Sequence, residues 1–371
     1  MTAVVLATGD VGGRRDDLSS IFRGCHELLA SGDLTFGQLE TTISARGAIV
    51  PNARLAMRSE PEMARAARDA GFDVMSFAGN HCLDWGYEAF QDTLAHARDA
   101  GLTLCGAGSD LEEARQPIFA KAGDVPVAFI AASSILPEGY AADERKAGCA
   151  PLRAHTVYEQ IEHDQPGTPA RIRTYPNRAD LAAMCDSVRL ASAQADIVLV
   201  SLHWGLHMTE AVIADYPRIA AHALIDAGAH AIIGHHPHIL KGIEFYRGRP
   251  IFYSLGNFAI EQPHIWDPSI LETASFKHLV SLNPNWNLET SYMLPEKTRL
   301  TGVAKLVCDT SGLREVRFAP AYVADDSAPI ILVPDNEQFE RVRAYLEEIS
   351  RAAGFETAFT QDREDLLLTA A

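Results

Sequence analysis

Short apolar runs that alternate with helix-like segments are the feature that most limits how this chain can fold. Ile197–Leu202 is a nearly continuous apolar run, of the kind that forms a strand covered on both faces of a sheet. Segments with helical spacing lie on either side of it, at Leu181–Ala193 and Ile213–Ala227. Strands that alternate with helices in this way predict an α/β fold with parallel strands at its centre.

The same alternation continues along most of the chain. We expect further strands at Val4–Thr8, Val74–Phe77, Thr103–Cys105, Val125–Ile130, Ala231–Ile233, Ile251–Tyr253, Val303–Val307 and Glu315–Val323. We expect further helices at Ile21–Ala30, between a capping box (Ser59 with Glu62) and Gly71, at Trp85–Ala100 and at Asn336–Ala353. This pattern predicts one domain over residues 1–323, followed over 324–371 by a helix and a frayed tail.

Two segments interrupt the alternation, at residues 136–177 and 261–300. Both are irregular and rich in proline, charge and scattered aromatic residues. Long irregular insertions in a compact domain are typically lids or binding loops. We therefore predict that both segments are lid-like, and that 261–300 forms part of the wall of a small-molecule pocket.

The charge balance excludes two classes of partner. The sequence of 371 residues has 32 Lys and Arg against 49 Asp and Glu, a formal net charge of −17 at pH 7. So acidic a surface repels nucleic acid and anionic membranes, and we expect neither as a partner.

Several absences in the sequence predict a cytoplasmic location. The start, MTAVVLATGDVGG, lacks the basic flank and long apolar core of a secretory signal. No later stretch approaches the ~18 consecutive apolar residues of a membrane span. The six cysteines are far apart, without CxxC spacing, as is typical of free thiols.

Polar residues of metal-ligand type follow several of the predicted strands. Because αβ folds place their sites at the carboxyl edge of the sheet, we expect these side chains to meet there. They are Asp10, Glu40, Asn80, His81, His203, His236 and His238. This mixture of oxygen and nitrogen ligands suits Zn, Mn or Fe better than Ca or Mg. More ligands are present than one four-coordinate ion needs, which favours two divalent metal ions that share a bridging carboxylate.

Five sequence blocks carry a resemblance to a known family. They are ATGDVG, FGQLETTIS, FAGNHCLDWG, VSLHWG and the long block IDAGAHAIIGHHPHILKGIEFYRGRPIFYSLGNF. In this order they resemble the CapA family of poly-γ-glutamate capsule proteins, over about 260 residues from Asp10 to Phe258. That family is similar in fold to the calcineurin-like metallophosphatases. The resemblance implies a four-layer α-β-β-α sandwich with a two-metal centre.

The resemblance also implies a role for each residue of the centre. Asp10 and His238 would hold metal 1; Asn80, His203 and His236 would hold metal 2; Glu40 would bridge them. His81 would be the catalytic histidine, as a proton donor or charge stabiliser. His235 would lie behind the ligands or contact substrate.

Three departures from the family pattern affect the expected site. Gln38 replaces the usual Asn before Leu-Glu, which affects the hydrogen bonds of the loop that carries Glu40. His207 replaces the Glu of many relatives, and we predict that it contacts a substrate bearing a carboxylate, phosphate or polarised carbonyl. The chain also lacks the amino-terminal membrane anchor of capsule-synthesis members, which favours a small soluble substrate.

Three functions are compatible with these residues. The family's link to γ-glutamyl chemistry favours a two-metal hydrolase of an amide, lactam or imide-type bond, with metal-activated water as the nucleophile. The alternative is a phosphoesterase, for which Arg14, Arg15 and His207 could line a phosphate pocket. A third reading is a non-catalytic capsule-assembly or binding protein, although no ligand motif is missing.

Overall fold

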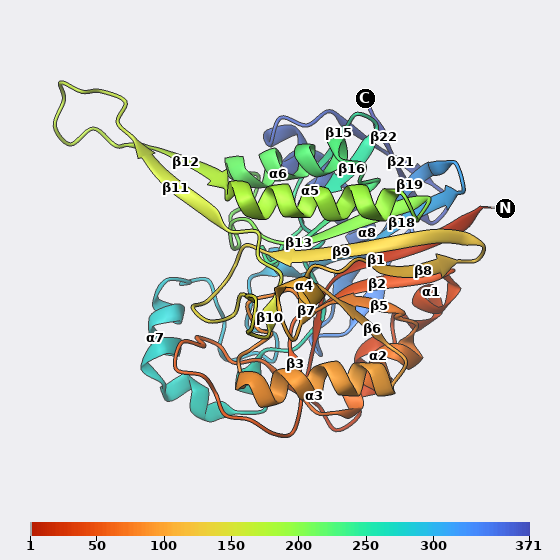
Figure 1. Cartoon of the computed structure of the whole chain (residues 1–371). Coiled ribbons are helices and arrows are strands. Elements are labelled where there is room, and N and C mark those ends of the chain that lie inside the picture. The colour runs from red at the N-terminus through yellow and green to blue at the C-terminus, as the bar shows by residue number, and fades with distance from the viewer. Residues whose placement is uncertain (1) are drawn as a thin grey trace.

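The computed structural model describes residues 2–371, which form two β-sheets packed face to face (Figure 1). The larger sheet has the order β21-β22-β19-β18-β1-β2-β5-β6, with β17 also beside β1 and β20 beside β19. Its strands are β1 (Ala3–Gly12), β2 (Leu34–Leu39), β5 (Val74–Ser76), β6 (Thr103–Cys105), β17 (Asn257–Ile260), β18 (Leu300–Asp309), β19 (Gly312–Val323), β20 (Pro329–Ile331), β21 (Thr357–Asp362) and β22 (Asp365–Ala370). The strands β1, β2, β5 and β6 are parallel to one another.

The smaller sheet has six strands in the order β15-β16-β14-β13-β9-β8. They are β8 (Ile118–Ala122), β9 (Val125–Ser133), β13 (Ile197–His203), β14 (Ala231–His235), β15 (Ile243–Tyr246) and β16 (Arg249–Phe252). Its four central strands, β9, β13, β14 and β16, are parallel, as the apolar runs predicted.

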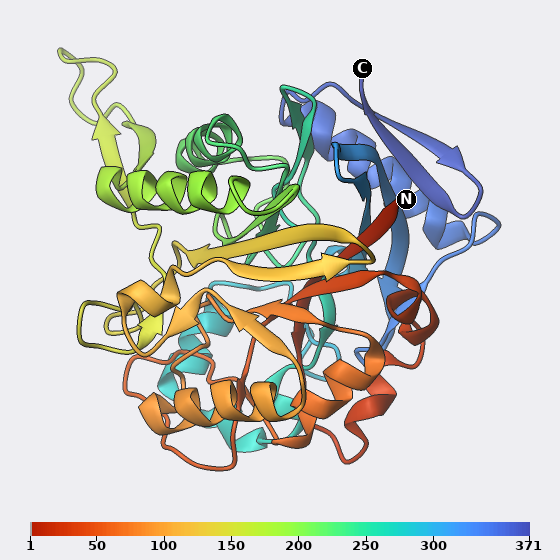
Figure 2. The same cartoon turned by 45° about the vertical axis from the view of Figure 1, so that its right-hand side comes forward.

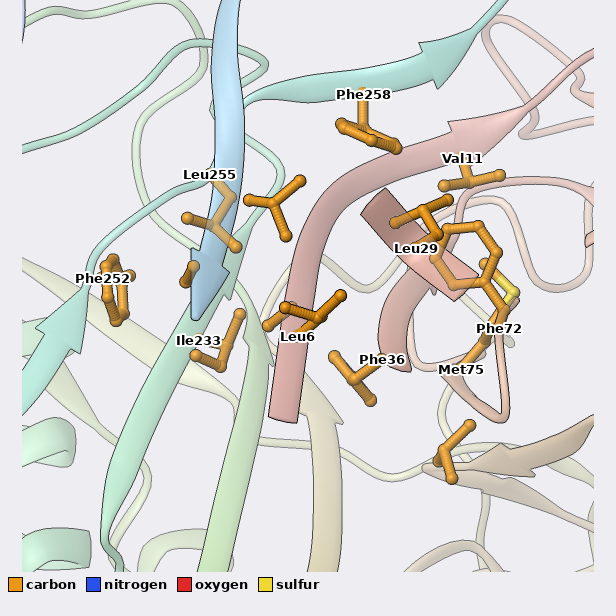
Figure 3. Packing of buried hydrophobic residues seen from close by; sticks show 14 of the residues in the cluster. Leu6, Val11, Leu29, Phe36, Phe72, Met75, Ile233, Phe252, Leu255 and Phe258 are labelled. Atoms are coloured by element: carbon orange, nitrogen blue, oxygen red, sulfur yellow. The ribbon is translucent and has the colours of Figure 1, made fainter. Parts of the chain in front are cut away.

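Alternation along the central strands buries both faces of this smaller sheet. Along β9, Val127 and Phe129 face the other sheet, whereas Ala128 and Ile130 face the outer helices. Figure 3 shows the first interface, where Leu6 and Phe36 of the larger sheet lie near Ile233 and Phe252 of the smaller one. The two sheets are therefore the middle layers of the molecule.

Helices cover both outer faces. The helices α5 (Arg178–Ser192) and α6 (Asp215–Asp226) pack on the smaller sheet, and α2 (Glu62–Ala70) and α3 (Gly86–Asp99) lie outside the larger one. The predicted four-layer α-β-β-α sandwich is therefore confirmed. The remaining helices are α1 (His26–Ser31), α4 (Leu111–Ala114), α7 (Ala274–Ser281) and α8 (Glu337–Ala352), with 3-10 turns η1 (Leu18–Phe22), η2 (Pro263–Ile265), η3 (Pro268–Glu272) and η4 (Glu296–Arg299).

The C-terminal segment differs from its sequence prediction. The helix α8 forms where expected, but the tail after Gly354 is not frayed, because β21 and β22 form a hairpin that pairs with β19 (Figure 2). Leu366 and Leu368 of β22 are buried in the main core. The strands of residues 324–371, β20, β21 and β22, therefore belong to the same sheet as β1. The division of the chain at residue 323 stays a prediction.

Two local predictions in the amino-terminal part were wrong. Ser59 does not cap α2; it lies in β4 (Arg58–Ser59), paired with β3 (Thr42–Ile43), and its hydroxyl donates to the carbonyl of Gly13. The expected helix over Ile21–Ala30 is split into η1 and α1. Gly24 at the break lies so close to a backbone carbonyl that a Cβ would be 2.5 Å from it.

The two predicted lids have different positions. In segment 136–177, β10 (Gly148–Cys149) pairs with β7 (Ala107–Gly108), which lies before the segment. The strands β11 (Ala154–Glu159) and β12 (Arg171–Pro176) form a hairpin that projects from the body (Figure 1). All six β11 residues are exposed. Segment 261–300 contains α7 and folds over the carboxyl edge of the sheets, where the polar residues meet.

Candidate metal centre

The carboxyl ends of strands from both sheets meet at one site. Asp10 lies in β1, Glu40 directly follows β2, and Asn80 follows β5 by a short loop. From the other sheet, His203 is the last residue of β13, and the turn 236–238 follows β14. Thus residues distant in sequence are adjacent because parallel strands end at the same edge.

Close packing of β1 against the segment before β17 places Asp10. A Cβ at Gly9 would lie 2.0 Å from the carbonyl oxygen of Gly256, so no residue larger than glycine fits there. The amide of Asp10 donates to that same carbonyl at 3.0 Å. In this parallel pairing, Asp10 lies opposite Asn257.

One group of ligand atoms surrounds the carboxylate of Asp10. Its Oδ2 lies 3.1 Å from Nδ1 of His238, and its Oδ1 lies 3.4 Å from Nδ1 of His235. Ligand atoms of Asp10, Glu40 and His238 all lie within 4.8 Å of one another. Two atoms bound to the same ion at ~2.1 Å are ~3 Å apart, so this spacing fits a metal site.

A second group lies on the other side of Glu40. Oδ1 of Asn80 is 2.7 Å from Nε2 of His203, which in turn is 3.5 Å from Oε1 of Glu40. The ring of His236 is centred 5.0 Å from the ring of His203. Glu40 thus lies within reach of both groups. The side chain of Gln38 approaches it, with Nε2 3.5 Å from Oε2 of Glu40.

Burial of these atoms without partners indicates that the site needs cations. Both carboxylate oxygens of Asp10 and Oε1 of Glu40 are buried, as is Nδ1 of His236. None of these atoms makes a hydrogen bond to any residue in 2–371. An unpaired buried polar atom costs ~1–3 kcal/mol, so several together are stable only if another group binds them.

The pKa values of the two carboxylates agree with this interpretation. Burial, followed by the charge of Asp10, raises the pKa of Glu40 well above its usual range. Burial would also raise the pKa of Asp10, but contacts with His235 and His238 outweigh it and hold that pKa low. Burial lowers the pKa of His203 and of His236, so both imidazoles are neutral and can ligate. Divalent cations fit this donor set.

His81 enters the site beside the ligands and is held from behind by Asp84. Its Nδ1 lies 2.6 Å from Oδ2 of Asp84, and its Nε2 lies 3.8 Å from Oε1 of Glu40. Asp84 is 1% exposed and also accepts hydrogen bonds from the amide of Met57 and the hydroxyl of Tyr140. The carboxylate therefore accepts a hydrogen bond from Nδ1–H of His81, and Nε2 of the same ring is directed to the site.

The backbone beside the ligands is held in a conformation that costs energy. His236, His238 and Met208 have φ of +92°, +57° and +48°, in the left-handed region that residues other than glycine seldom adopt. The amide of Met208 donates to the carbonyl of Pro237 at 3.0 Å, which joins the two turns. Such strain is common at functional sites because it aims side chains that regular structure would direct elsewhere.

His207 and His235 have different environments. His207 lines the cavity, with its ring centred 5.4 Å from that of His238. Loss of water around the ring and the charge of His238 lower its pKa, so it acts as a neutral hydrogen-bonding group rather than as a cation. His235 is 0% exposed and does not line the cavity. Its geometry supports the contact with Asp10 and not a substrate contact.

The two arginines suggested for a phosphate pocket are engaged elsewhere. Arg15 pairs with Glu261 at 2.7 Å, and Arg14 pairs with Glu60 at the same distance. Neither lines the cavity beside the centre. The reason is that β17 brings Glu261 next to the end of β1, a contact between residues 246 positions apart.

Two residues of the site were missed by the sequence reasoning. Asn257 accepts a hydrogen bond from His238 at 2.8 Å through Oδ1, and its Nδ2 donates to Tyr292. Asp84 orients His81, as described above. Both lie inside blocks already singled out, YSLGNF and FAGNHCLDWG, so their membership of those blocks was the available signal.

A cavity of about 850 Å³ opens beside the centre. Glu40, Asn80, His81, His236 and His238 form its polar end. Residues of segment 261–300, including Leu279, Leu282 and Trp286, line another part, so the prediction that this segment contributes to the wall agrees with the structure. Segment 136–177 contributes only its first residues, 136–138.

Fold and site together define an α/β sandwich protein with a candidate centre for divalent metal ions at its strand ends. Residues 5–262 match the family described as "Bacterial capsule synthesis protein PGA_cap", and the chain belongs to this family. The family resemblance predicted from the motifs is thereby confirmed.

Curated relatives match the same region. The chain is 29% identical over 245 residues to the PGA biosynthesis protein CapA of Bacillus subtilis (strain 168), covering 66% of this chain and 57% of that protein. It is 35% identical over 230 residues to a probable polyglutamine synthesis accessory protein of Mycobacterium tuberculosis, covering 61% and 55%. The chain thus spans just over half the length of these relatives.

Solved structures similar to the chain have low sequence identity. The calcineurin-like phosphoesterase YfkN of Bacillus subtilis is 11% identical, with 95% of this chain and 97% of that chain covered and a TM-score of 0.43. A hypothetical protein from Thermus thermophilus is 16% identical, with coverage of 89% and 98% and a TM-score of 0.47. Among residues 2–371, no helix combines the length and the apolar character needed to cross a membrane.

Proposed function

We propose that this chain is a hydrolase that uses two divalent metal ions to attack an amide, lactam or imide-type bond of a small soluble substrate. The observation that carries the proposal is the set of buried ligand atoms without partners at one end of a cavity. Asp10 and His238 would hold one ion, Asn80, His203 and His236 the other, and Glu40 both. The mixed oxygen and nitrogen donors favour Zn, Mn or Fe.

The metal ions would supply an acidified water molecule and positive charge for the developing oxyanion. The chain supplies the rest of the chemistry. His81 presents Nε2 to the reacting atoms, where its protonated form, paired through Nδ1 with Asp84, can donate a proton to the leaving group. Asp84 holds the ring orientation and the tautomer.

Two observations favour the amide-type bond over a phosphoester. The arginines that would have marked a phosphate pocket pair with Glu60 and Glu261 instead. The curated relatives are named for the synthesis of PGA or polyglutamine, whose chemistry is that of amide bonds. A phosphoesterase is the second candidate, since His207 can still donate a hydrogen bond to a phosphate. A non-catalytic capsule-assembly protein is the third, and the cytoplasmic location stays a prediction.

Metal content and turnover test the proposal together. Purified protein should contain about two metal ions per chain, as measured by inductively coupled plasma mass spectrometry. It should release p-nitroaniline from γ-glutamyl p-nitroanilide faster than phosphate from p-nitrophenyl phosphate. His81→Gln should keep both ions and lower kcat by ~10²–10⁴-fold, the range for a general acid.

A matched histidine provides the control. His163→Gln changes an exposed residue at the tip of the β11–β12 hairpin and should leave metal content and kcat unchanged. Loss of metal in His81→Gln would make His81 a ligand instead of a proton donor. A protein that binds no metal at all would favour the non-catalytic reading, and faster phosphate release would favour the phosphoesterase.

A further inference from the structure

The composition of the cavity restricts the substrate further. Away from the metal centre, one part of its wall is apolar and includes Leu55, Met208, Leu279, Leu282, Trp286 and Leu294, whereas Asn52, Glu138, Gln262 and Asn283 line other parts. The apolar residues come from three separate parts of the chain: the loop before β4, the turn after β13 and segment 261–300. A small hydrophobic cluster that includes Phe276, Tyr292 and Met293 packs behind the wall and supports it.

Positive charge is scarce in this cavity. Among the described residues that line it, Arg54 is the only lysine or arginine, and it is exposed at the surface. Glu40, Asp84 and Glu138 also line the cavity. Apart from Arg54 and the metal centre, the wall therefore offers an anionic ligand no cationic partner.

A polyglutamate chain suits such a cavity poorly. Each of its residues carries a carboxylate, and burying a carboxylate against an apolar wall without a partner costs several kcal/mol. The formal net charge of −17 also repels a polyanion at long range. Burial of an apolar group on the same wall is favourable, by ~0.8 kcal/mol for each CH₂.

The rim of the cavity is held in place rather than loose. The side chain of Asn52 donates to the carbonyl of Glu138 at 2.7 Å and so joins the two loops on one side. On the other side, Met208 is fixed by its hydrogen bond to Pro237. These bonds fix the loops that carry Asn52 and Met208, and a volume of about 850 Å³ accommodates a body larger than a glutamyl group.

We propose that the substrate is amphipathic, with one anionic or carbonyl head at the metal centre and an apolar alkyl or aryl body on the Leu282–Trp286 wall. This inference rests on the proposed function, because the head is taken to bind the metal ions. The proposed substrate differs from a polyglutamate chain, which carries a carboxylate on each residue. Specificity resides in the apolar wall, and the centre supplies the chemistry.

Binding of n-alkyl hydroxamates to the metal-loaded protein tests the inference without turnover. Isothermal titration calorimetry would compare acetohydroxamate, butanohydroxamate and octanohydroxamate, with tri-γ-glutamate as the polyanionic probe. Each buried methylene should lower Kd about fourfold, so burial of at least two of the four extra methylenes should make octanohydroxamate bind at least ~10-fold more tightly than butanohydroxamate. Tri-γ-glutamate should bind more weakly than either.

An exposed leucine pair gives a matched comparison. Leu282 is 61% exposed at the wall, and Leu190 is 63% exposed on α5, away from the cavity. Because neither side chain is in the core, Leu282→Asp and Leu190→Asp should both fold. Leu282→Asp should reduce the preference for octanohydroxamate at least ~5-fold and leave acetohydroxamate binding unchanged, whereas Leu190→Asp should change neither.

The outcomes separate this inference from the proposed function. If all three hydroxamates bind with the same Kd, the metal centre stands and the apolar body is refuted. Tighter binding of tri-γ-glutamate than of octanohydroxamate would also overturn the inference. If no hydroxamate binds and the protein holds no metal, both the inference and the proposed function fail.

Discussion

Replacing Glu40 by glutamine should reverse the order of stability with and without metal. Glu40 is 1% exposed, its Oε1 makes no hydrogen bond within residues 2–371, and Asp10 lies close by. Without metal, the wild type carries the cost of this unpaired group, ~1–3 kcal/mol. Burial and Asp10 oppose ionisation of this carboxyl and raise its pKa, whereas an amide has no charge to suppress, so Glu40→Gln should stabilise the metal-free protein.

Metal binding should stabilise both proteins, but the wild type more than the variant. A metal at 100 times its Kd stabilises the folded state by ~2.7 kcal/mol. The variant offers a neutral oxygen where the wild type offers a carboxylate, so its affinity and its gain should be smaller. At ~2 °C per kcal/mol, we expect Tm of metal-free Glu40→Gln to be ~2–6 °C above that of the wild type. With saturating zinc or manganese, the wild type should have the higher Tm.

Thermal unfolding in EDTA and in excess metal, followed by circular dichroism, measures both effects. Glu364→Gln, an exposed glutamate in the turn between β21 and β22, is the matched control and should behave as the wild type does. A lower Tm for metal-free Glu40→Gln, together with a full metal-induced shift, would show that Glu40 is a structural carboxylate and would refute this reasoning.

Three further predictions concern residues around the centre. Asp84→Asn should lose the negative charge behind His81 and one of the two oxygens that accept hydrogen bonds from His81, Met57 and Tyr140. It should lower kcat at least ~10-fold (~1.4 kcal/mol) at unchanged metal content; an unchanged kcat would exclude its positioning role. Lys241 is 1% exposed, donates to three backbone carbonyls of the loop 209–212, and burial lowers its pKa to about 8 despite nearby Glu210. Between about pH 8 and ~10.4 the unfolded state therefore binds more protons than the folded state, so the cost of burying the charged Lys241 disappears as the pH rises. Over that window, urea melts should show the free energy of unfolding of the wild type rising by up to ~3 kcal/mol relative to that of Lys241→Met. His207→Ala should raise KM without changing metal content, equally at pH 6 and pH 8, because its lowered pKa keeps the imidazole neutral; a KM effect confined to pH 6 would show a charged ring instead.

Local periodicity was sufficient for the framework of this fold. The apolar runs that became β9, β13 and β14 are buried on both faces, and a strand of that kind needs no distant information to be recognised. Asp10, Glu40 and His203 were found because each lies in or directly after such a strand. Parallel strands that end at one edge then bring them together, whatever the loops between them do.

Predictions that depended on a partner distant in sequence were the ones that failed. We expected the tail after Gly354 to fray, but the hairpin of β21 and β22 is ordered against the edge of β19, a strand distant from it in sequence. Ser59 has the spacing of a capping box, but the nearby carbonyl of Gly13 takes its hydroxyl. A local pattern cannot report such competition, because the competing group lies 46 residues away in the chain.

The sequence by itself determined the alternation of strands and helices, through periodicity, and the family, through contiguous motifs; the resemblance to that family implied the sandwich and the candidate ligands. Tertiary structure alone decided which groups serve the centre and which support the fold. It paired Arg14 and Arg15 with glutamates, placed Asp84 behind His81 and set Asn257 against His238. It also assembled the apolar wall from three separate segments. The physical reason is that the free energy of a buried charge or an apolar surface depends on what lies within a few ångströms, and chain order does not specify those neighbours.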